Sequence, residues 1–565
     1  MKRRRIRNQH IIELVVTLVI IILLNFIGSS FYYRFDLTSE KRYTLSPATK
    51  EILDSLDDIA YIKVYLDGEL PAGFLRMKTA IKELLDEFRW YNQANIRYDF
   101  IDPLEDQDPG IRRNIIAQLY KAGLQPTNIQ VKQKDGSTMQ KIIFPGAIIS
   151  YSGVDVAVNL LKNNPGVNAE INLNNSIQSL EYEFISMLRN LNSKQVEKVA
   201  FIEGHGELNE LQTGDITKSL ANFYQVDRGK IGGRYGCLNN YKAVIIAKPM
   251  QRFSESDKFV IDQYIMNGGK VLWFLDVVRV SLDSLLDGST YAFYSPVNID
   301  DQLFRYGVRI NPDLVKDIQC HVIPVNKGLA GGSPQWSLSP WFYFPVISPS
   351  DKYPVTKSLN MIKLEFASSI DTVGEPGKII KEVLLATSPY TKLVQLPELV
   401  SLSESDIAPK ELEFNSSSVP VGVILEGSFE SVFKNRSIPE GVSGGPPQIK
   451  TSGDRTSMLV VSDGDIIKNE VLPTADGPAI EPLGFDRYTS QVFGNSDFIL
   501  NAVNYMTDET GLITLRGREL KLRLLDREKV RDERLKWELI NLVLPSIIII
   551  LAGLVINIYR KKAYR

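Results

Sequence analysis

The residues best suited to chemistry stand in one short run, Glu203-Gly204-His205-Gly206-Glu207. A histidine between two carboxylates has the groups of a general base or of a metal ligand. The run follows the apolar stretch 196–204, which we interpret as a buried strand, so it falls at the carboxyl end of a sheet, where α/β proteins usually bind ligands. The alternative is a tight turn in which the glycines let the backbone bend and His205 makes local hydrogen bonds. We favour the turn and keep 203–207 as the candidate functional loop.

Two aspartates, Asp276 and Asp463, also fall at predicted strand ends. Acids in such places bind cations or cap turns, and both are common in α/β sheets. The chain has three histidines, His10, His205 and His321, and His10 borders a hydrophobic run. Because a multi-histidine metal centre needs several such side chains together, we predict no metal ligands in this chain.

Sequence signatures of catalysis are missing. A G-x-S-x-G nucleophile elbow is absent, and Cys237 lies in a Gly/Asn-rich loop instead of a strand-to-helix turn. No G-x-x-x-x-G-K-[ST] phosphate-binding loop occurs either. We therefore predict no catalytic residues, no bound cofactor and no enzymatic activity. Cys237 and Cys320 are either two free thiols or one bridge, and the sequence leaves both open.

The elements that must position these residues follow an α/β rhythm from residue 196 onward. Predicted strands are 196–204, 241–249, 270–276 and 457–465, and predicted helices are 210–224, 254–269 and 495–507. We interpret 196–510 as a flavodoxin- or glutamine-amidotransferase-like α/β domain. Within it, the region of about 300–450 is rich in Pro, Ser and Gly with short strand-like runs, which favours a β-rich insertion.

A separate extracytoplasmic α/β domain is predicted over 36–192. Ser46-Pro47 has the pattern of an N-cap followed by proline at the first helical position. Predicted strands are 59–66, 96–102, 128–133 and 140–150, and predicted helices are 74–92, 111–122 and 176–191. Their order is similar to the thioredoxin arrangement. No cysteine precedes Cys237, so thiol chemistry is excluded in this domain.

Both ends of the chain are hydrophobic. The predicted order is a basic tail (1–10), a transmembrane helix (11–29), the two domains, a membrane-proximal linker (511–537), a second transmembrane helix (538–559) and a basic tail (560–565). Basic residues at both termini predict that both are cytoplasmic and that the main body is periplasmic, in a two-pass protein of a bacterial inner membrane. A cleaved signal peptide is the alternative for the first segment, but Gly28-Ser29-Ser30 is a poor cleavage site.

Composition narrows the classes of function. The 565 residues carry 65 basic and 67 acidic side chains, a net charge of −2, so no overall field favours nucleic acid. A hydrophobic fraction of 44% and a charged fraction of 23% are those of a globular protein and argue against disorder over most of the chain. Two helices are too few to form a conduction path, so any transport needs partner subunits.

Three segments carry a resemblance to a known family: DLTSEKRYTLSPATKEIL (36–53), VAFIEGHGE (199–207) and DQYIMNGGKVLWFLD (262–276). They are similar to the GldG family, the gliding-motility-associated ABC transporter auxiliary (substrate-binding-like) proteins of Bacteroidetes, over essentially the whole chain. The resemblance implies a non-enzymatic partner of a polytopic permease and of a separate cytoplasmic ABC ATPase that binds the ATP. It offers no catalytic residues to carry over.

The sequence therefore predicts a non-enzymatic accessory subunit of an ABC transporter complex, docked on a permease through its two helices. The lipid bilayer and periplasmic envelope proteins are the other partners expected. Two alternatives stay open. One is a membrane-anchored hydrolase or amidotransferase-like enzyme that uses the loop at His205, and the other is a pure envelope scaffold without a substrate.

Overall fold

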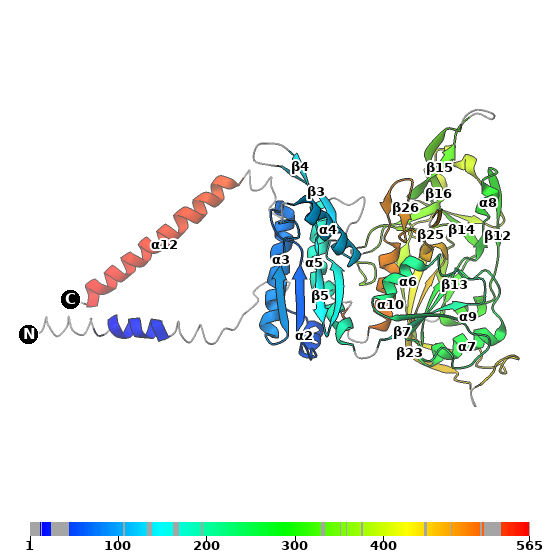
Figure 1. Cartoon of the computed structure of the whole chain (residues 1–565), viewed down its shortest axis with the longest axis horizontal. Helices are drawn as coiled ribbons and strands as arrows, with labels where there is room; N and C mark the ends of the chain where they lie inside the picture. Colours follow the sequence, from blue (N-terminus) through cyan, green and yellow to red (C-terminus); the bar gives the residue numbers. More distant parts are fainter. Residues whose placement is uncertain are drawn as a thin grey trace, which may run out of the picture. The chain divides into compact units, whose positions relative to one another are not determined.

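A computed structural model gives the fold of the chain (Figure 1). It describes residues 12, 14–23, 44–105, 108–132, 138–161, 169–193, 196–328, 334–350, 352–357, 359–374, 377–445, 449–475, 477–508, 511–512 and 533–563. The chain divides into two units, Met1–Arg518 and Glu519–Arg565. The first unit contains two α/β regions, so the predicted mixed α/β class is confirmed.

The first α/β region contains a four-stranded sheet in the order β2-β1-β5-β6. Its strands are β1 (Ala60–Val64), β2 (Ile96–Phe100), β5 (Gly146–Tyr151) and β6 (Val154–Asn159). β1 and β2 are parallel and are joined by helix α3 (Ala72–Tyr91), which gives a βαβ unit built from the predicted strands and helix. The other two pairs are antiparallel. The thioredoxin-like assignment stays a prediction.

Helices cover both faces of this sheet. Ala60, Ile62 and Val64 share a core with α3 and with helices α2 (Pro47–Asp54) and α5 (Ala169–Asn192). On the opposite face, α4 (Pro109–Lys121) packs against the sheet in a second, smaller cluster. Helix α2 begins where the sequence predicts it, because the Ser46 hydroxyl accepts a hydrogen bond of 2.9 Å from the Thr49 N–H.

One predicted strand is wrong. The segment 140–150 is two strands, because β4 (Thr138–Ile143) ends before Pro145 and β5 begins after it. Proline cannot donate to a strand ladder, so it separates the two. β4 pairs with β3 (Thr127–Lys132) in a sheet of their own.

The second α/β region is built on a seven-stranded sheet in the order β19-β22-β23-β10-β9-β7-β8. Its strands are β7 (Lys198–Glu203), β8 (Gln225–Lys230), β9 (Ala243–Ala247), β10 (Lys270–Phe274), β19 (Ile379–Ala386), β22 (Pro420–Glu430) and β23 (Ser452–Val461). The five strands from β8 to β23 are parallel, and β22 is antiparallel to both β23 and β19. The region of about 300–450 therefore adds two strands to the central sheet.

Successive residues of β10 show how this sheet divides two cores. Val271 and Trp273 lie in the core that includes α7 (Glu255–Met266), whereas Leu272 and Phe274 lie in the core that includes α6 (Gly214–Ala221) and α10 (Asn495–Thr507). Parallel strands covered by helices on both faces form a doubly wound arrangement. The carboxyl ends of its parallel strands meet along one edge.

The remaining strands build smaller antiparallel sheets around this core. They are β11 (Val278–Arg279), β12 (Ser289–Tyr294) and β21 (Glu398–Ser401); β13 (Val308–Ile310) and β18 (Ile370–Thr372); β14 (Asp313–Asp317) and β20 (Thr391–Gln395); β15 (Cys320–Asn326), β16 (Trp336–Ile347) and β17 (Ile362–Lys363); β24 (Val471–Thr474) and β25 (Gly477–Ile480); β26 (Phe485–Asp486) and β27 (Gln491–Val492). Two short helices, α8 (Leu282–Leu285) and α9 (Asp300–Tyr306), lie between β11 and β13 in the chain.

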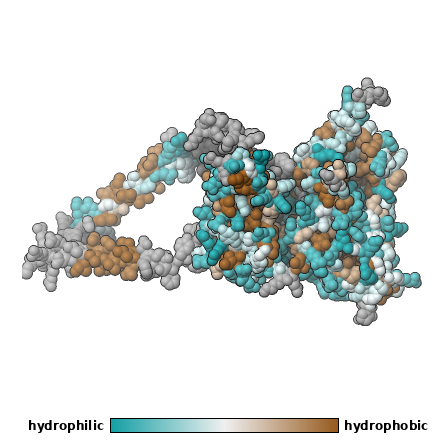
Figure 2. All heavy atoms as spheres, in the orientation of Figure 1, coloured by the Kyte–Doolittle hydropathy of each residue, from teal (hydrophilic) through white to brown (hydrophobic). Residues whose placement is uncertain are grey.

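The second unit contains helix α12 (Arg534–Ala563). Its segment Lys536–Tyr559 is the one helix within the described residues that is long and apolar enough to cross a membrane. Figure 2 shows hydrophobic residues along the middle of this helix. Near the N-terminus the described apolar helix is shorter, Leu14–Leu23, and most of the rest of the predicted 11–29 segment, like the predicted tail 1–10, lies outside the described residues.

Candidate functional site

The predicted functional loop, residues 203–207, begins at the last residue of β7, and neighbouring residues hold it in place. His205 Nδ1 lies 3.0 Å from Glu207 Oε1, and His205 Nε2 lies 3.1 Å from Asp257 Oδ2. The imidazole also stacks on Phe253 with 3.8 Å between ring centroids. Only 5% of His205 is exposed, so both ring nitrogens are engaged inside the protein.

The charges around His205 stabilise its protonated form. Burial alone lowers the pKa of His205, but the hydrogen bonds and charges of Asp257 and Glu207 outweigh it and raise this pKa to about 9. The pKa of Asp257 is lowered, because the hydrogen bonds from His205 and from the Gly233 N–H outweigh its burial. At neutral pH the loop therefore contains an imidazolium between two carboxylates, which is an electrostatic cross-link and a poor general base.

The glycines of the loop serve its shape. Gly204 and Gly206 have φ values of +118° and +74°, in the region that side chains with a Cβ rarely adopt. The turn brings the His205 carbonyl to the N–H groups of Met250 and Gln251, at 2.9 and 2.7 Å. These hydrogen bonds join the loop after β7 to the loop after β9. They support the interpretation of residues 203–207 as a tight structural turn.

The second predicted feature forms a cluster with a residue that the sequence did not single out. Asp276 and Asp463, each two residues beyond its strand, converge with Asp465, and one carboxylate oxygen of each lies within 4.8 Å of the others. We call these three residues the aspartate cluster. Lys248, the residue after β9, is ion-paired with Asp465 and, at 2.9 Å, with Asp276 Oδ2.

Burial and mutual repulsion set the charge of the cluster. Burial, with repulsion from Asp465, raises the pKa of Asp276 to about 6 even though Lys248 opposes the shift. Burial and the other two aspartates also raise the pKa of Asp463. Burial likewise favours protonation of Asp465, but Lys248 and Lys468 outweigh it and lower the pKa of that carboxyl. Lys248 itself has a raised pKa, because the paired carboxylates outweigh its burial, so it is fully charged.

The contacts of the aspartate cluster bear on whether it binds a cation or has a structural role. Three convergent carboxylate oxygens are a ligand set that hard cations prefer. The Lys248 ammonium already contacts two of the three carboxylates and supplies the balancing charge. Asp463 is held in addition by the N–H groups of Glu365 and Asp465, both at 2.7 Å. The cluster is thus a charge-compensated junction of three strand ends, which supports a structural role.

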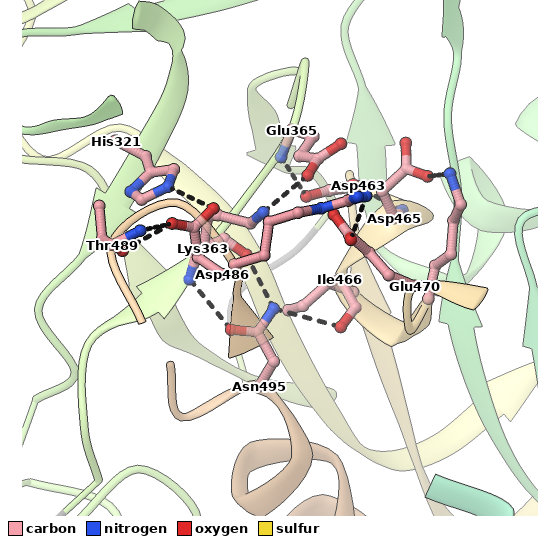
Figure 3. Close-up of polar contacts among 12 residues, drawn as sticks. His321, Lys363, Glu365, Asp463, Asp465, Ile466, Glu470, Asp486, Thr489 and Asn495 are labelled. Carbon is pink, nitrogen blue, oxygen red and sulfur yellow. Dashed lines mark hydrogen bonds and ion pairs between the residues drawn. The ribbon is translucent and has the colours of Figure 1, made fainter. Parts of the chain in front are cut away.

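A cavity of about 770 Å³ adjoins this junction. It is lined by α8, β15, β16 and the segments that follow β17 and β23, and Asp465 of the aspartate cluster is one of its lining residues. We call it the β15 cavity. Figure 3 shows some of the polar side chains on its wall, among them His321, Lys363 and Asp486, which come from segments far apart in the chain. Ligands of doubly wound proteins bind beyond the carboxyl ends of the strands, where this cavity lies.

The polar wall of the β15 cavity includes an ion pair and a histidine that lies beside a carboxylate. Lys363 Nζ lies 2.9 Å from Glu365 Oε1, and this pair outweighs burial to raise the pKa of Lys363 (Figure 3). His321 Nε2 lies 3.1 Å from Asp486 Oδ1, although it makes no well-aligned hydrogen bond. Burial lowers the pKa of His321 in spite of that carboxylate, so the imidazole is neutral at neutral pH.

The sequence analysis identified some of the residues of this site and missed others. Asp276 and Asp463 could be placed because each follows an apolar strand. Lys248 also directly follows a predicted strand, so the same signal could have identified it, but the sequence analysis did not single it out. His321 and Asp486 come from segments with weak patterns, and no sequence signal pairs them. Cys237 and Cys320 are both free and partly buried, so the bridge between them is absent.

Comparison with known proteins places the site in a family. Residues 197–502 match the family described as ABC-type uncharacterized transport system. The chain belongs to this family. The match contains the His205 loop, the aspartate cluster and the β15 cavity, and it confirms the prediction of an auxiliary protein of an ABC-type transport system. Residues 39–150 match a second family, described as a domain of unknown function.

Two further similarities are more distant. An uncharacterized protein of Borreliella burgdorferi is 23% identical over 443 residues, which cover 76% of this chain and 80% of that protein. Among solved structures, the mmIFT52 N-terminal domain matches with a TM-score of 0.30 and 13% identity, over 55% of this chain and 97% of that one. The transport-system family is therefore the comparison that bears on function.

Proposed function

We propose that this chain is a non-enzymatic accessory subunit of an ABC transporter complex, held in the membrane and docked on a permease through its helices. The observation that carries the proposal is the apolar segment Lys536–Tyr559, which follows a body matched to a transport-system family. A single spanning helix cannot conduct a substrate, so its role is to anchor the body and to contact other helices. The ATP would bind to a separate cytoplasmic ATPase subunit.

The finer parts of the proposal rest on the sequence. Basic residues at both termini support a two-pass topology in a bacterial inner membrane, with the body in the periplasm. The resemblance of 36–53, 199–207 and 262–276 to the GldG family of Bacteroidetes supports a complex that serves gliding motility. In a gliding host, loss of the chain should then stop surface spreading while growth in liquid continues.

The enzyme alternative is supported less well. A hydrolase that used His205 would need a free ring nitrogen next to a nucleophile, but carboxylates hold both nitrogens and raise the pKa of the imidazole to about 9. The scaffold alternative shares the anchors with our proposal and differs in whether a permease is bound.

Copurification tests the proposal directly. The tagged full chain, solubilised in a mild detergent, should bring down a polytopic permease and an ABC ATPase. In a matched control, residues 536–559 are replaced by an unrelated spanning helix of similar hydropathy, so that the chain stays in the membrane. That control should lose the permease. Isolation of both chains without partners contradicts the proposal, and equal recovery of partners by both assigns docking to another part of the chain.

A further inference from the structure

The β15 cavity has a second wall that the paired charges do not explain. This wall is apolar and reaches solvent: the lining residues Leu286, Trp336 and Leu282 are 82%, 68% and 45% exposed. Exposed apolar residues in a contiguous group mark sites of interaction. A small molecule would be enclosed by its pocket, whereas an open apolar rim fits a longer chain that passes across it.

The strand that lines the cavity presents its edge. All six residues from His321 to Asn326 in β15 line it, although successive side chains of a strand point to opposite faces. Consecutive lining is expected when the backbone edge itself faces the cavity. β15 is the terminal strand of the sheet β15-β16-β17, and no strand pairs with its other side within the described residues. Its edge can therefore accept an added strand.

The charge of the lining selects the partner. Two lysines, Lys363 and Lys468, line the cavity, against six carboxylates: Asp287, Glu365, Asp406, Asp465, Glu470 and Asp486. Four of the six are ion-paired, since Glu365, Asp465, Asp406 and Glu470 each contact a lysine or an arginine. Asp287 and Asp486, whose partner His321 is neutral, are left as the negative excess, which attracts a basic segment and repels an acidic one. The same excess disfavours the surface of an anionic membrane.

We propose that the β15 cavity binds an extended segment of a partner protein with alternating apolar and basic residues, which adds as a strand to the free edge of β15. Alternate side chains of such a segment would reach the apolar wall and the carboxylates. Pro324 has no N–H to donate. Because the backbone groups of alternate residues face the free edge of an antiparallel strand, the other residues on that side supply the donors. The inference goes beyond the proposed transport role and does not depend on it.

A peptide assay tests the charge and the strand pairing separately. The full chain in nanodiscs of zwitterionic lipid is titrated into a fluorescent Lys-Val repeat of about eight residues, a common strand length, with empty nanodiscs as the background. We expect saturable binding that weakens as salt rises to about 150 mM. A Glu-Val repeat should bind at least about tenfold more weakly, as should a Lys-Val repeat N-methylated at alternate residues. Equal binding of the methylated peptide overturns strand addition, and no binding overturns the proposal.

Variants locate the site. Trp336→Ser and Leu286→Ser remove exposed side chains, so the fold should persist, and each should weaken binding at least about tenfold. Trp90→Ser and Leu412→Ser remove side chains that are 54% and 94% exposed away from the cavity and should bind normally. Asp287→Lys should weaken the Lys-Val peptide and strengthen the Glu-Val peptide. If the cavity variants bind as tightly as the controls, the site is elsewhere and the proposal fails.

Hydrogen exchange gives an independent measurement. Within residues 320–326, the backbone N–H groups that face the free edge of β15 should exchange more slowly when the Lys-Val peptide is bound, because an added strand pairs with these alternate residues. Unchanged exchange there, with binding intact, overturns the strand model. A chain that copurifies with a permease but binds no peptide contradicts this inference alone, and a chain that binds the peptide without a permease contradicts only the transport proposal.

Discussion

Lys248 and Asp276 meet beyond the ends of two neighbouring parallel strands, with 2.9 Å between Nζ and Oδ2. The same ammonium is paired with Asp465, and Asp463 lies beside these two carboxylates. Lys248 thus contacts two of the acids that would otherwise repel one another at the centre of the sheet edge. Lys468 also pairs with Asp465, but its side chain is 34% exposed against 17% for Lys248, so the stability of this edge depends more on Lys248.

Replacing Lys248 by methionine should destabilise the protein strongly. Methionine keeps the apolar stem but leaves buried carboxylates without a partner, which costs about 3–5 kcal/mol. The loss should be largest at neutral pH and shrink toward pH 4, because protonation removes the unbalanced charge. Denaturant unfolding across this pH range measures it.

Lys468 is the matched control for this change. It is also paired with Asp465, at 3.3 Å, but its side chain is 34% exposed. Lys468→Met should therefore cost no more than about 1 kcal/mol. Equal losses for the two variants, or a loss for Lys248→Met that does not depend on pH, would show that the cluster is not held by charge balance.

Gly464 should resist substitution because of Lys248. A Cβ at this position would lie 2.7 Å from Lys248 Cβ and 3.0 Å from Lys248 Cα, too close for ordinary contact. Gly464→Ala should cost about 1–3 kcal/mol as the two loops separate. Its φ is −85°, so the cost is one of packing and not of backbone strain.

Gly445→Ala provides the comparison. A Cβ there would meet only Val442 Cγ1, at 3.7 Å. The change should be neutral or stabilise by up to about 1 kcal/mol, because alanine restricts the unfolded chain. If denaturant unfolding gives both variants a similar free energy of unfolding, the loops around Lys248 can move apart without a loss of stability.

Features that depend on contiguous residues could be predicted from the sequence, whereas contacts between distant residues could not. The strands and helices around residues 196–276 could be placed because their apolar runs, caps and glycine stops are contiguous; helix α7, for example, begins after Ser254, whose hydroxyl accepts a hydrogen bond from the Asp257 N–H. β8 was missed because its sequence, QVDRGK, is polar, as an edge strand of a sheet permits. The pairing of His321 with Asp486 joins residues 165 positions apart, and only the fold brings them together.

His205 should titrate far from an ordinary histidine. Its pKa is raised from 6.5 to about 9, so the native state binds a proton that the unfolded state releases between these values. The stabilisation from the His205 loop is therefore fully present below pH 6.5 and is lost as the pH rises through about 9. Selective labelling of the three histidines for NMR should show one imidazole with an apparent pKa near 9 and another, His321, below 6.5.

The variant His205→Gln extends this test. Glutamine cannot carry the charge that binds Glu207 and Asp257, so the variant should lose about 2–4 kcal/mol at pH 7. The difference from the natural protein should narrow above pH 9, where the natural imidazole is neutral as well. Loss of function with full stability would instead support the enzyme alternative.

The two-anchor topology can be decided by removing one helix at a time. A chain without residues 533–565 lacks α12 and should still resist carbonate extraction, because 11–29 is apolar enough to hold it in the bilayer. Removing 1–35 as well should release a folded body. If the first truncation alone releases the protein, then 11–29 is cleaved or too short to anchor, and α12 is the sole attachment.

In the full chain, Ile548→Asp places a charge in the middle of α12 at a cost of about 2.5–3.5 kcal/mol for insertion. This variant should stay in the membrane through its first helix yet lose the permease, since a helix that inserts poorly cannot present a packing surface to its partner.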